Sequence, residues 1–238
     1  MSKYIIDKRY KTKVDRSDRV LEISEAFGIG LDDKEFVVFD KLEVSIEQGD
    51  VVYITGQSGS GKSTILRELT AQMTEEGLHV AVIDKVQVEE KPLVDSIGKD
   101  TRDALNILSI VGITDAYLFV RKPSELSDGQ LYRFKLAKLI ESGAKVWVAD
   151  EFLAVLDRDT AKVIAFNLQR IARQVGATVL VATTHSDMVQ DLAPNVTINK
   201  RYRERVEIIK APEGYKDLFS AVTPQPLPAQ YEHLNLWN

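Results

Sequence analysis

The chain has 238 residues, of which 44% are hydrophobic and 28% are charged, and its formal net charge is −5. These values exclude a disordered or fibrous chain, and the negative charge argues against a broadly basic nucleic-acid binder. There is no cysteine, which excludes disulfides and cysteine-based metal sites. No stretch approaches the roughly 20 apolar residues of a membrane-spanning helix, and the start has no apolar run long enough for a secretory signal. We therefore expect a cytoplasmic protein.

The first part of the chain, up to about Glu47, is expected to be extended. Short apolar or alternating runs at 19–23, 35–39 and 42–46 are separated by glycines and aspartates, which predicts short strands joined by turns. Two basic runs, at 8–19 and 200–205, are interpreted as solvated faces. The alternative is a patch for nucleic acid or another polyanion.

From residue 51 onward, the pattern alternates between buried strands and amphipathic helices. This alternation predicts parallel strands joined by helical crossovers. A mostly helical insertion is expected over about 88–143, and a proline-punctuated tail over 211–238. The predicted strands are 51–55, 79–84, 145–150 and 178–184, and the predicted helices begin at Ser63 or span 103–111, 131–140 and 160–175.

Residues 56–64, GQSGSGKST, match the phosphate-loop pattern G-x-x-x-x-G-K-[ST] between a predicted strand and a predicted helix. Glycines let the backbone amides turn toward one phosphate, and the following helix adds its positive end. Lys62 supplies a full charge to the β- and γ-phosphates, and the Ser63 hydroxyl is suited to ligate Mg²⁺. The predicted ATP-binding residues of this loop are Gly56, Gln57, Ser58, Gly59, Ser60, Gly61, Lys62, Ser63 and Thr64.

The apolar strand predicted at 145–150 ends in two adjacent carboxylates, Asp150 and Glu151. A carboxylate at the tip of a strand beside a phosphate loop can hold Mg²⁺, and Asp150 is assigned that role. Glu151 points elsewhere and is predicted to polarise the attacking water.

Three further motifs follow in an order that resembles the ATP-binding-cassette (ABC) ATPases. The sequence LSDGQ at 126–130 resembles the LSGGQ signature, AVLD at 154–157 resembles the D-loop, and TTH at 183–185 resembles the switch histidine. The resemblance covers roughly 20–200. It implies an α/β P-loop NTPase core sheet with an antiparallel β subdomain and a small helical subdomain. The corresponding nucleotide-binding domain would span 1–210, followed by the tail.

In this family two domains face each other head to tail, and each ATP lies between one phosphate loop and the other domain's signature. The resemblance therefore implies an ATP-dependent homodimer that binds and hydrolyses MgATP. The residues it assigns are Ser127, Gly129, Gln130 and Asp157 for ATP binding, and Glu151, His185 and Lys62 for catalysis.

Two assignments from the resemblance have alternatives. Phe27 lies where an aromatic side chain stacks on adenine, but it could instead be a core residue. Gln87 is the candidate Q-loop glutamine that contacts Mg²⁺ and the attacking water, yet its interval from Lys62 is shorter than in transporter ATPases. Asp128 replaces the first glycine of the signature, at a position that can carry a side chain.

The biological role has two interpretations. The short interval before Gln87, the compact insertion and the unusual tail favour a soluble, non-transport ATPase that couples hydrolysis to a protein or nucleic-acid partner; it is loosely similar to stand-alone ABC ATPases associated with acetyltransferase domains. The alternative is the ATP-binding subunit of a membrane transporter, with a transmembrane partner docked at 88–98. A regulator with little hydrolysis is disfavoured because Glu151 and His185 are both present.

Overall fold

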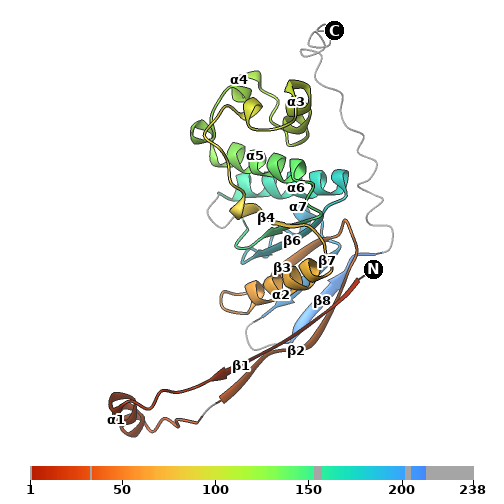
Figure 1. Ribbon diagram of the computed structural model, residues 1–238. Helices are drawn as coiled ribbons and strands as arrows, with labels where there is room; N and C mark the ends of the chain where they lie inside the picture. Colours follow the sequence, from red (N-terminus) through yellow and green to blue (C-terminus); the bar gives the residue numbers. More distant parts are fainter. Residues whose placement is uncertain (1, 33, 153–156, 202–204, 213–238) are drawn as a thin grey trace. The chain divides into compact units, whose positions relative to one another are not determined.

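The computed structural model describes residues 2–32, 34–152, 157–201 and 205–212. The chain divides into two units, one of residues 3–45 and one of residues 1–2 and 46–238 (Figure 1). The tail expected at 211–238 lies almost entirely outside the described residues, as do most of the D-loop and part of the second basic run.

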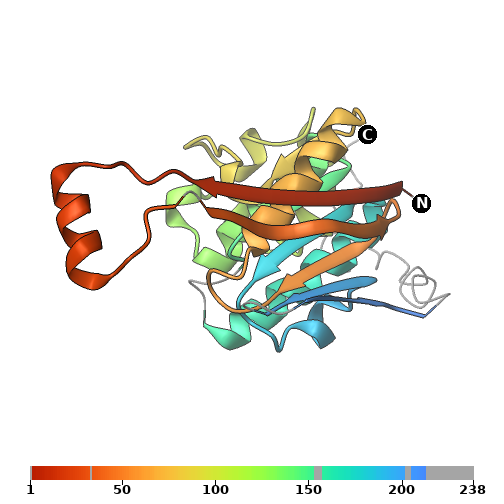
Figure 2. The same cartoon turned by 90° about the horizontal axis from the view of Figure 1, so that it is seen from below.

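The small unit is a two-stranded sheet of β1 (Ser2–Thr12) and β2 (Lys34–Ile46). Figure 2 shows the two strands side by side, with the helix α1 (Asp18–Phe27) inserted between them in sequence. β2 is one continuous strand where two separate runs were predicted, and Lys41 within it has a φ of 46°.

The extended conformation predicted for 19–23 is wrong, because these residues lie inside α1. Local hydrogen bonds explain the helix. The Ser17 hydroxyl accepts from the backbone N–H of Val20 (3.4 Å) at the start. Gly28 takes the left-handed conformation at the end, where Ile29 N donates to Ser24 O (3.0 Å). Capping groups at both ends therefore outweigh the apparent strand pattern between them.

The larger unit is built on a six-stranded sheet in the order β4-β5-β6-β3-β7-β8. All neighbours are parallel except β8, which runs antiparallel to β7. Parallel order requires crossover helices, as the alternating sequence pattern predicted. The strands are β3 (Val51–Thr55), β4 (Val80–Val82), β5 (Val146–Ala149), β6 (Thr178–Thr183), β7 (Val196–Lys200) and β8 (Val206–Lys210).

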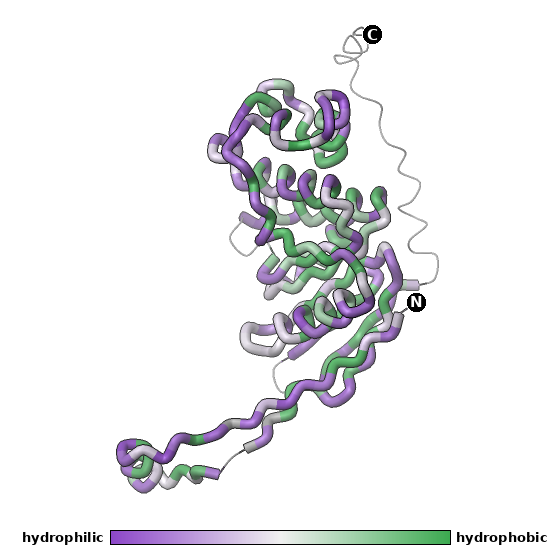
Figure 3. The backbone as a smooth tube through the Cα atoms, viewed as in Figure 1, coloured by the Kyte–Doolittle hydropathy of each residue, from purple (hydrophilic) through white to green (hydrophobic). Residues whose placement is uncertain are grey.

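Helices cover both faces of this sheet. Figure 1 shows α2 (Lys62–Glu75) on one side and α6 (Arg158–Val175) and α5 (Asp128–Glu141) on the other. A hydrophobic core cluster lies on the α5 and α6 side, where every second residue of the strands, Tyr53 and Trp147 among them, is fully buried. Figure 3 shows the central strands as hydrophobic segments, as expected for a parallel sheet buried on both faces.

The insertion predicted over 88–143 contains helices and no strand. Its elements before α5 are η2 (Leu93–Asp95), α3 (Thr101–Ile110), α4 (Ala116–Phe119) and η3 (Pro123–Glu125). The strand predicted at 79–84 is shorter than expected, because β4 ends at Val82 and a 3-10 turn, η1 (Ile83–Lys85), follows. Another short helix, α7 (Val189–Leu192), lies between β6 and β7.

Candidate ATP-binding site

The loop of residues 56–61 joins β3 to α2 and needs glycine at its first position. Gly56 has a φ of 148°, and a Cβ there would lie 1.8 Å from the carbonyl oxygen of Lys200 at the end of β7. The loop therefore passes against the neighbouring strand with no room for a side chain. Gly61 caps the start of α2 without a side-chain hydrogen bond, so the positive end of the helix faces the loop interior.

The ammonium group of Lys62 is folded over this loop. Its Nζ donates to the carbonyl oxygens of Gly56 (2.8 Å) and Gln57 (2.7 Å). Burial lowers the pKa of Lys62, and the negative charges of Asp150 and Glu151 oppose that shift. Ser60 Oγ is buried and has no hydrogen-bond partner in the described part of the chain. A phosphate oxygen would give this hydroxyl an acceptor, so the loop fits the group it was predicted to bind.

Two predicted metal ligands meet at the carboxyl edge of the sheet. Ser63 Oγ, at the start of α2, donates to Asp150 Oδ1 at the end of β5 (3.0 Å). The described residues hold no cluster of three or more histidine, aspartate or glutamate side chains suited to a metal. One hydroxyl and one carboxylate nevertheless suit Mg²⁺, which takes few protein oxygens and completes its shell with water and phosphate oxygens.

A pocket of about 420 Å³ opens beside these groups. It lies at the carboxyl ends of parallel strands, where ligands bind in open α/β sheets. The register of Thr55 with Thr183 brings the end of β6 level with the start of the phosphate loop. The lining residues are Ser58, Gly59, Gly61, Lys62, Ser63, Thr64, Asp150, Glu151, Ala182, Thr183 and Thr184.

Glu151 lines this pocket with an unusual backbone. Its φ is 50°, a left-handed value that costs free energy for any residue other than glycine. Its N–H donates to Asp150 Oδ1 (3.0 Å), so the same carboxylate oxygen contacts both Ser63 and the backbone of Glu151. Both carboxylates line the pocket, and their separate roles stay predictions.

His185 follows β6 and is half-buried beside the pocket without lining it. The backbone N–H of His185 donates to Thr183 Oγ1 (3.2 Å). Its carbonyl oxygen accepts from the hydroxyl of Tyr53, a fully buried residue of β3. Burial raises the pKa of Tyr53, which keeps the hydroxyl protonated and able to donate. The sequence reasoning read Tyr53 only as part of a buried strand and missed this anchor.

The signature residues form the start of α5. Ser127 Oγ accepts from Gln130 N (3.4 Å), and Gln130 Oε1 accepts from Ser127 N (3.0 Å), which makes a capping box. Ser127 is exposed, and a Cβ on Gly129 would lie 3.6 Å from Thr160 of α6. None of these signature residues lines the phosphate-loop pocket. The signature and the phosphate loop of one chain therefore do not form a single site.

Asp157 is the described residue of the predicted D-loop; residues 154–156 of that motif lie outside the described part. It caps the start of α6, where its Oδ1 accepts from Thr160 N (2.9 Å). Hydrogen bonds from Thr160 lower the pKa of the carboxyl. The carboxylate is therefore charged and held at the helix N-terminus.

Comparison with known proteins shows the family of this chain. The family described as "ABC transporter" matches residues 39–82. The cell division ATP-binding protein FtsE of Streptococcus pneumoniae is 30% identical over 212 residues, which cover 74% of this chain and 90% of FtsE. The chain belongs to the ABC ATPase family.

Other members of the ABC family differ in length from this chain. The methionine import ATP-binding protein MetN 1 of Oceanobacillus iheyensis is 27% identical over 194 residues, which cover 67% of this chain and 57% of that protein. The chain therefore spans little more than half of this relative.

Solved structures agree on the ABC ATPase fold. CbiO1 of Clostridium perfringens, part of the transporter complex CbiONQ, has a TM-score of 0.57 at 19% identity, over 78% of this chain and 85% of that one. The ATP-binding cassette MJ0796, in a dimer with ADP and phosphate, also has a TM-score of 0.57, at 18% identity, over 88% of this chain and all of that one. The expected α/β fold with an antiparallel β subdomain is confirmed.

The roles of all the site residues remain predictions, and Phe27 and Gln87 are two that do not line the pocket. Phe27 is the last residue of α1 in the small unit and is 73% exposed, so its alternative as a core residue is wrong. Gln87 follows η1, is exposed and does not line the pocket.

In the described part of the chain, no helix combines the length and apolar character needed to cross a membrane.

Proposed function

We propose that two copies of this ABC ATPase bind MgATP between them, head to tail, with each nucleotide held by the phosphate loop of one copy and the signature of the other. The observation that carries this proposal is the separation of the two halves within one chain. The pocket has the phosphate loop, Asp150 and Glu151 on its walls, whereas Ser127 is exposed elsewhere on the surface. A second copy would supply the missing half and would bring the α5 N-terminus to the γ-phosphate.

Each residue of that site would have a separate role. The loop amides and Lys62 would hold the β- and γ-phosphates, and Ser63 with Asp150 would hold Mg²⁺, which neutralises phosphate charge when bound. Glu151 would accept hydrogen bonds from the attacking water and orient it. His185 would contact the γ-phosphate from the end of β6.

The partner best supported by the relatives is a membrane protein. MetN 1 is described by its name as a methionine import protein, and CbiO1 as part of a transporter complex. These relatives support the transporter interpretation over the soluble, non-transport role that the short interval before Gln87 suggested. We therefore propose an ATP-binding subunit that works at the cytoplasmic face of a transmembrane partner.

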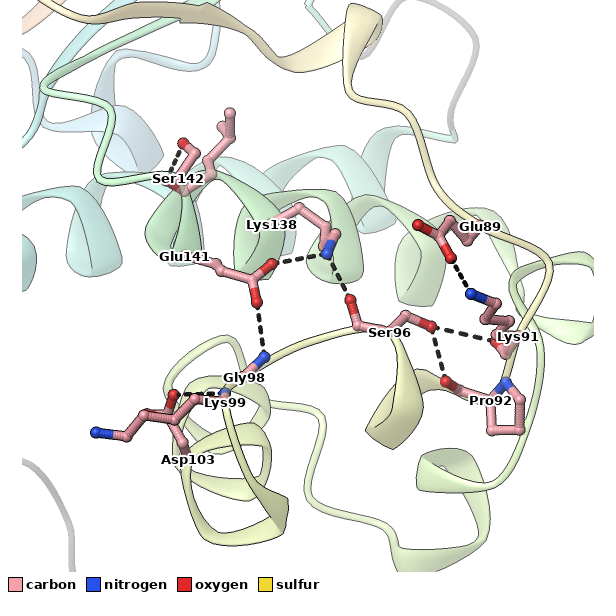
Figure 4. A network of polar contacts seen from close by, with 11 residues as sticks. Glu89, Lys91, Pro92, Ser96, Gly98, Lys99, Asp103, Lys138, Glu141 and Ser142 are labelled. Atoms are coloured by element: carbon pink, nitrogen blue, oxygen red, sulfur yellow. Dashed lines mark hydrogen bonds and ion pairs between the residues drawn. The ribbon is translucent and has the colours of Figure 1, made fainter.

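The segment proposed to dock that partner, 88–98, is attached to the signature helix (Figure 4). Lys138 Nζ of α5 donates to Ser96 O (2.5 Å), and Glu141 Oε1 of α5 accepts from Gly98 N (2.7 Å). Lys138 and Glu141 also form an ion pair (2.7 Å). A displacement of this segment would therefore be transmitted to α5, whose N-cap is Ser127.

A second candidate follows from FtsE, whose 90% coverage exceeds that of MetN 1 and whose name assigns it to cell division. In that case ATP hydrolysis would act on a protein of cell division instead of moving a solute. The docking segment and the ATP site would serve either role without change.

The experiment that tests the proposal uses Glu151→Gln. This variant is expected to bind ATP normally, to hydrolyse it at least about a hundredfold more slowly, and to accumulate as a dimer in size-exclusion chromatography with light scattering. Lys62→Ala is the matched control that should stay monomeric with ATP. A monomeric Glu151→Gln protein saturated with ATP would contradict the dimer.

The partner is tested by affinity capture of Glu151→Gln with ATP from detergent-solubilised membranes, with Lys62→Ala as the control. Recovery of a polytopic membrane protein in the first sample alone supports the membrane role. Enrichment of a soluble protein or a nucleic acid instead would contradict it.

A further inference from the structure

An ion pair joins the start of α6 to the loop that carries His185. Arg158 is the first residue of α6, directly after Asp157, and Asp187 lies two residues after His185. Arg158 Nε and Nη2 both donate to Asp187 Oδ2, at 2.8 Å and 2.5 Å. Two donors on one carboxylate oxygen fix the direction of the guanidinium as well as its distance.

The rest of this loop is held from the sheet side. The hydroxyl of Tyr53 binds the carbonyl oxygen of His185, the His185 N–H binds Thr183 Oγ1, and Met188 is buried. Arg158 thus adds a contact that ties the loop to α6. Lys162, one turn along α6, is a second positive charge facing Asp187, and the Arg158 hydrogen bonds hold the pKa of Asp187 below its ordinary value.

The ion pair is too exposed to be a major source of stability. The side chains of Arg158 and Asp187 are 65% and 32% exposed, and exposed ion pairs of this kind contribute little to folding free energy. Its geometric effect is larger, because it joins two segments that the ABC site uses together. Asp157 belongs to the predicted D-loop, and His185 is the predicted switch residue.

We propose that Arg158 and Asp187 are positioning residues that couple the D-loop to the switch histidine. A displacement of Asp157, which begins α6 together with Arg158, would be carried through Asp187 to the His185 loop. The hydrogen bond from the Tyr53 hydroxyl to the His185 carbonyl oxygen would hold the other side of that loop in place. This inference rests on the proposed role of His185 and adds the contact that would set its position when a second copy approaches the D-loop.

The test is a charge exchange followed by steady-state ATPase kinetics. Arg158→Asp and Asp187→Arg are each expected to lower kcat about tenfold, a loss typical of a misplaced reacting group, and to change the KM for ATP less than about twofold. The double exchange restores the pair in reverse and should bring kcat back to within about threefold of wild type. Arg158→Lys, which retains the charge but not the two-donor geometry, should give an intermediate kcat.

The matched control is the exposed ion pair between Lys3 and Glu43 in the small unit (2.7 Å), exchanged in the same way, which should leave kcat unchanged. Thermal denaturation should give similar midpoints for all variants, so a loss of kcat would not reflect unfolding. Wild-type kcat in both single variants, or no recovery in the double variant, would overturn the coupling.

Variants of His185 separate this inference from the proposal on which it depends. If His185→Ala loses turnover while Arg158→Asp keeps the wild-type kcat, the coupling is rejected and the role of His185 stands. Wild-type turnover in His185→Ala would instead reject the role of His185 and the coupling with it.

Discussion

The hydroxyl of Ser63 donates to Asp150 across 87 positions of sequence, at 3.0 Å. This contact joins the first turn of α2 to the end of β5 and brings a hydroxyl and a carboxylate to one point beside the pocket. The pair also fixes the turn at Glu151, because Asp150 Oδ1 accepts from the Glu151 N–H.

We predict that Asp150→Asn weakens Mg²⁺-dependent ATP binding at least about tenfold, because an amide removes the charge that a divalent cation requires. Calorimetry with ATP in the presence and absence of Mg²⁺ measures the effect, which should be much smaller without the metal. Glu75→Gln, an exposed carboxylate near the end of the same helix as Ser63, is the control. Equal affinity of the Asp150→Asn protein and the wild type for MgATP would remove Asp150 from the metal site.

Gly56→Ala is expected to destabilise the fold by about 3 kcal/mol or more, since the added Cβ would collide with the backbone of Lys200. Gly77→Ala is the comparison. Gly77 also has a positive φ, of 81°, but a Cβ there meets nothing within 4 Å, so its cost should be about 1 kcal/mol. Urea denaturation measures both, and equal losses would show that the approach of Lys200 is unimportant.

Ser127→Arg should prevent ATP-dependent dimerisation while the monomer stays folded. Ser127 is exposed at the start of α5, so a long cationic side chain fits the monomer but would fill the space proposed for the partner's nucleotide. Light scattering of Glu151→Gln with and without the added Ser127→Arg is the measurement. A dimer that persists in the double variant would mean that the signature is not at the interface.

Glu141→Ala should free the segment at Gly98 from α5. Removing the carboxylate leaves Gly98 N–H without its acceptor at 2.7 Å, which costs about 1 kcal/mol. Hydrogen exchange at the Gly98 amide should accelerate accordingly. Glu89→Ala provides the control, because Glu89 pairs with Lys91 at the surface (2.6 Å) and its loss should not affect Gly98. Unchanged exchange in the Glu141 variant would contradict the attachment.

The parts of the fold that the sequence predicted well are those governed by local pattern. Buried β-branched strands, amphipathic helices and glycine-rich loops each leave a signal within a few residues, so the phosphate loop and its flanking elements could be placed in advance. The region around α1 failed because apolar residues at 20, 21 and 23 fit a strand as well as a helix over so short a span. Only the capping groups at Ser17 and Gly28 distinguish the two.

Contacts between distant segments were harder to predict. Tyr53 resembles any aromatic residue in a buried strand, and its bond to His185 spans 132 positions. Arg158 and Asp187 are each ordinary surface charges until the fold brings α6 beside the loop after β6. Gln87 shows the opposite case, a residue whose type suggested a site role that its position does not support. Its residue type suggested a role, but β4 ends early and an added turn separates it from the strand.

The helix α1 has ten residues and buries none of them. Isolated helices of that length are marginal in water, so its two caps provide most of what holds it. Its amides should therefore exchange with solvent deuterium by local opening, long before those of the central sheet. That difference makes α1 an internal reporter: slowed exchange confined to its ten amides would reveal when another molecule binds the small unit.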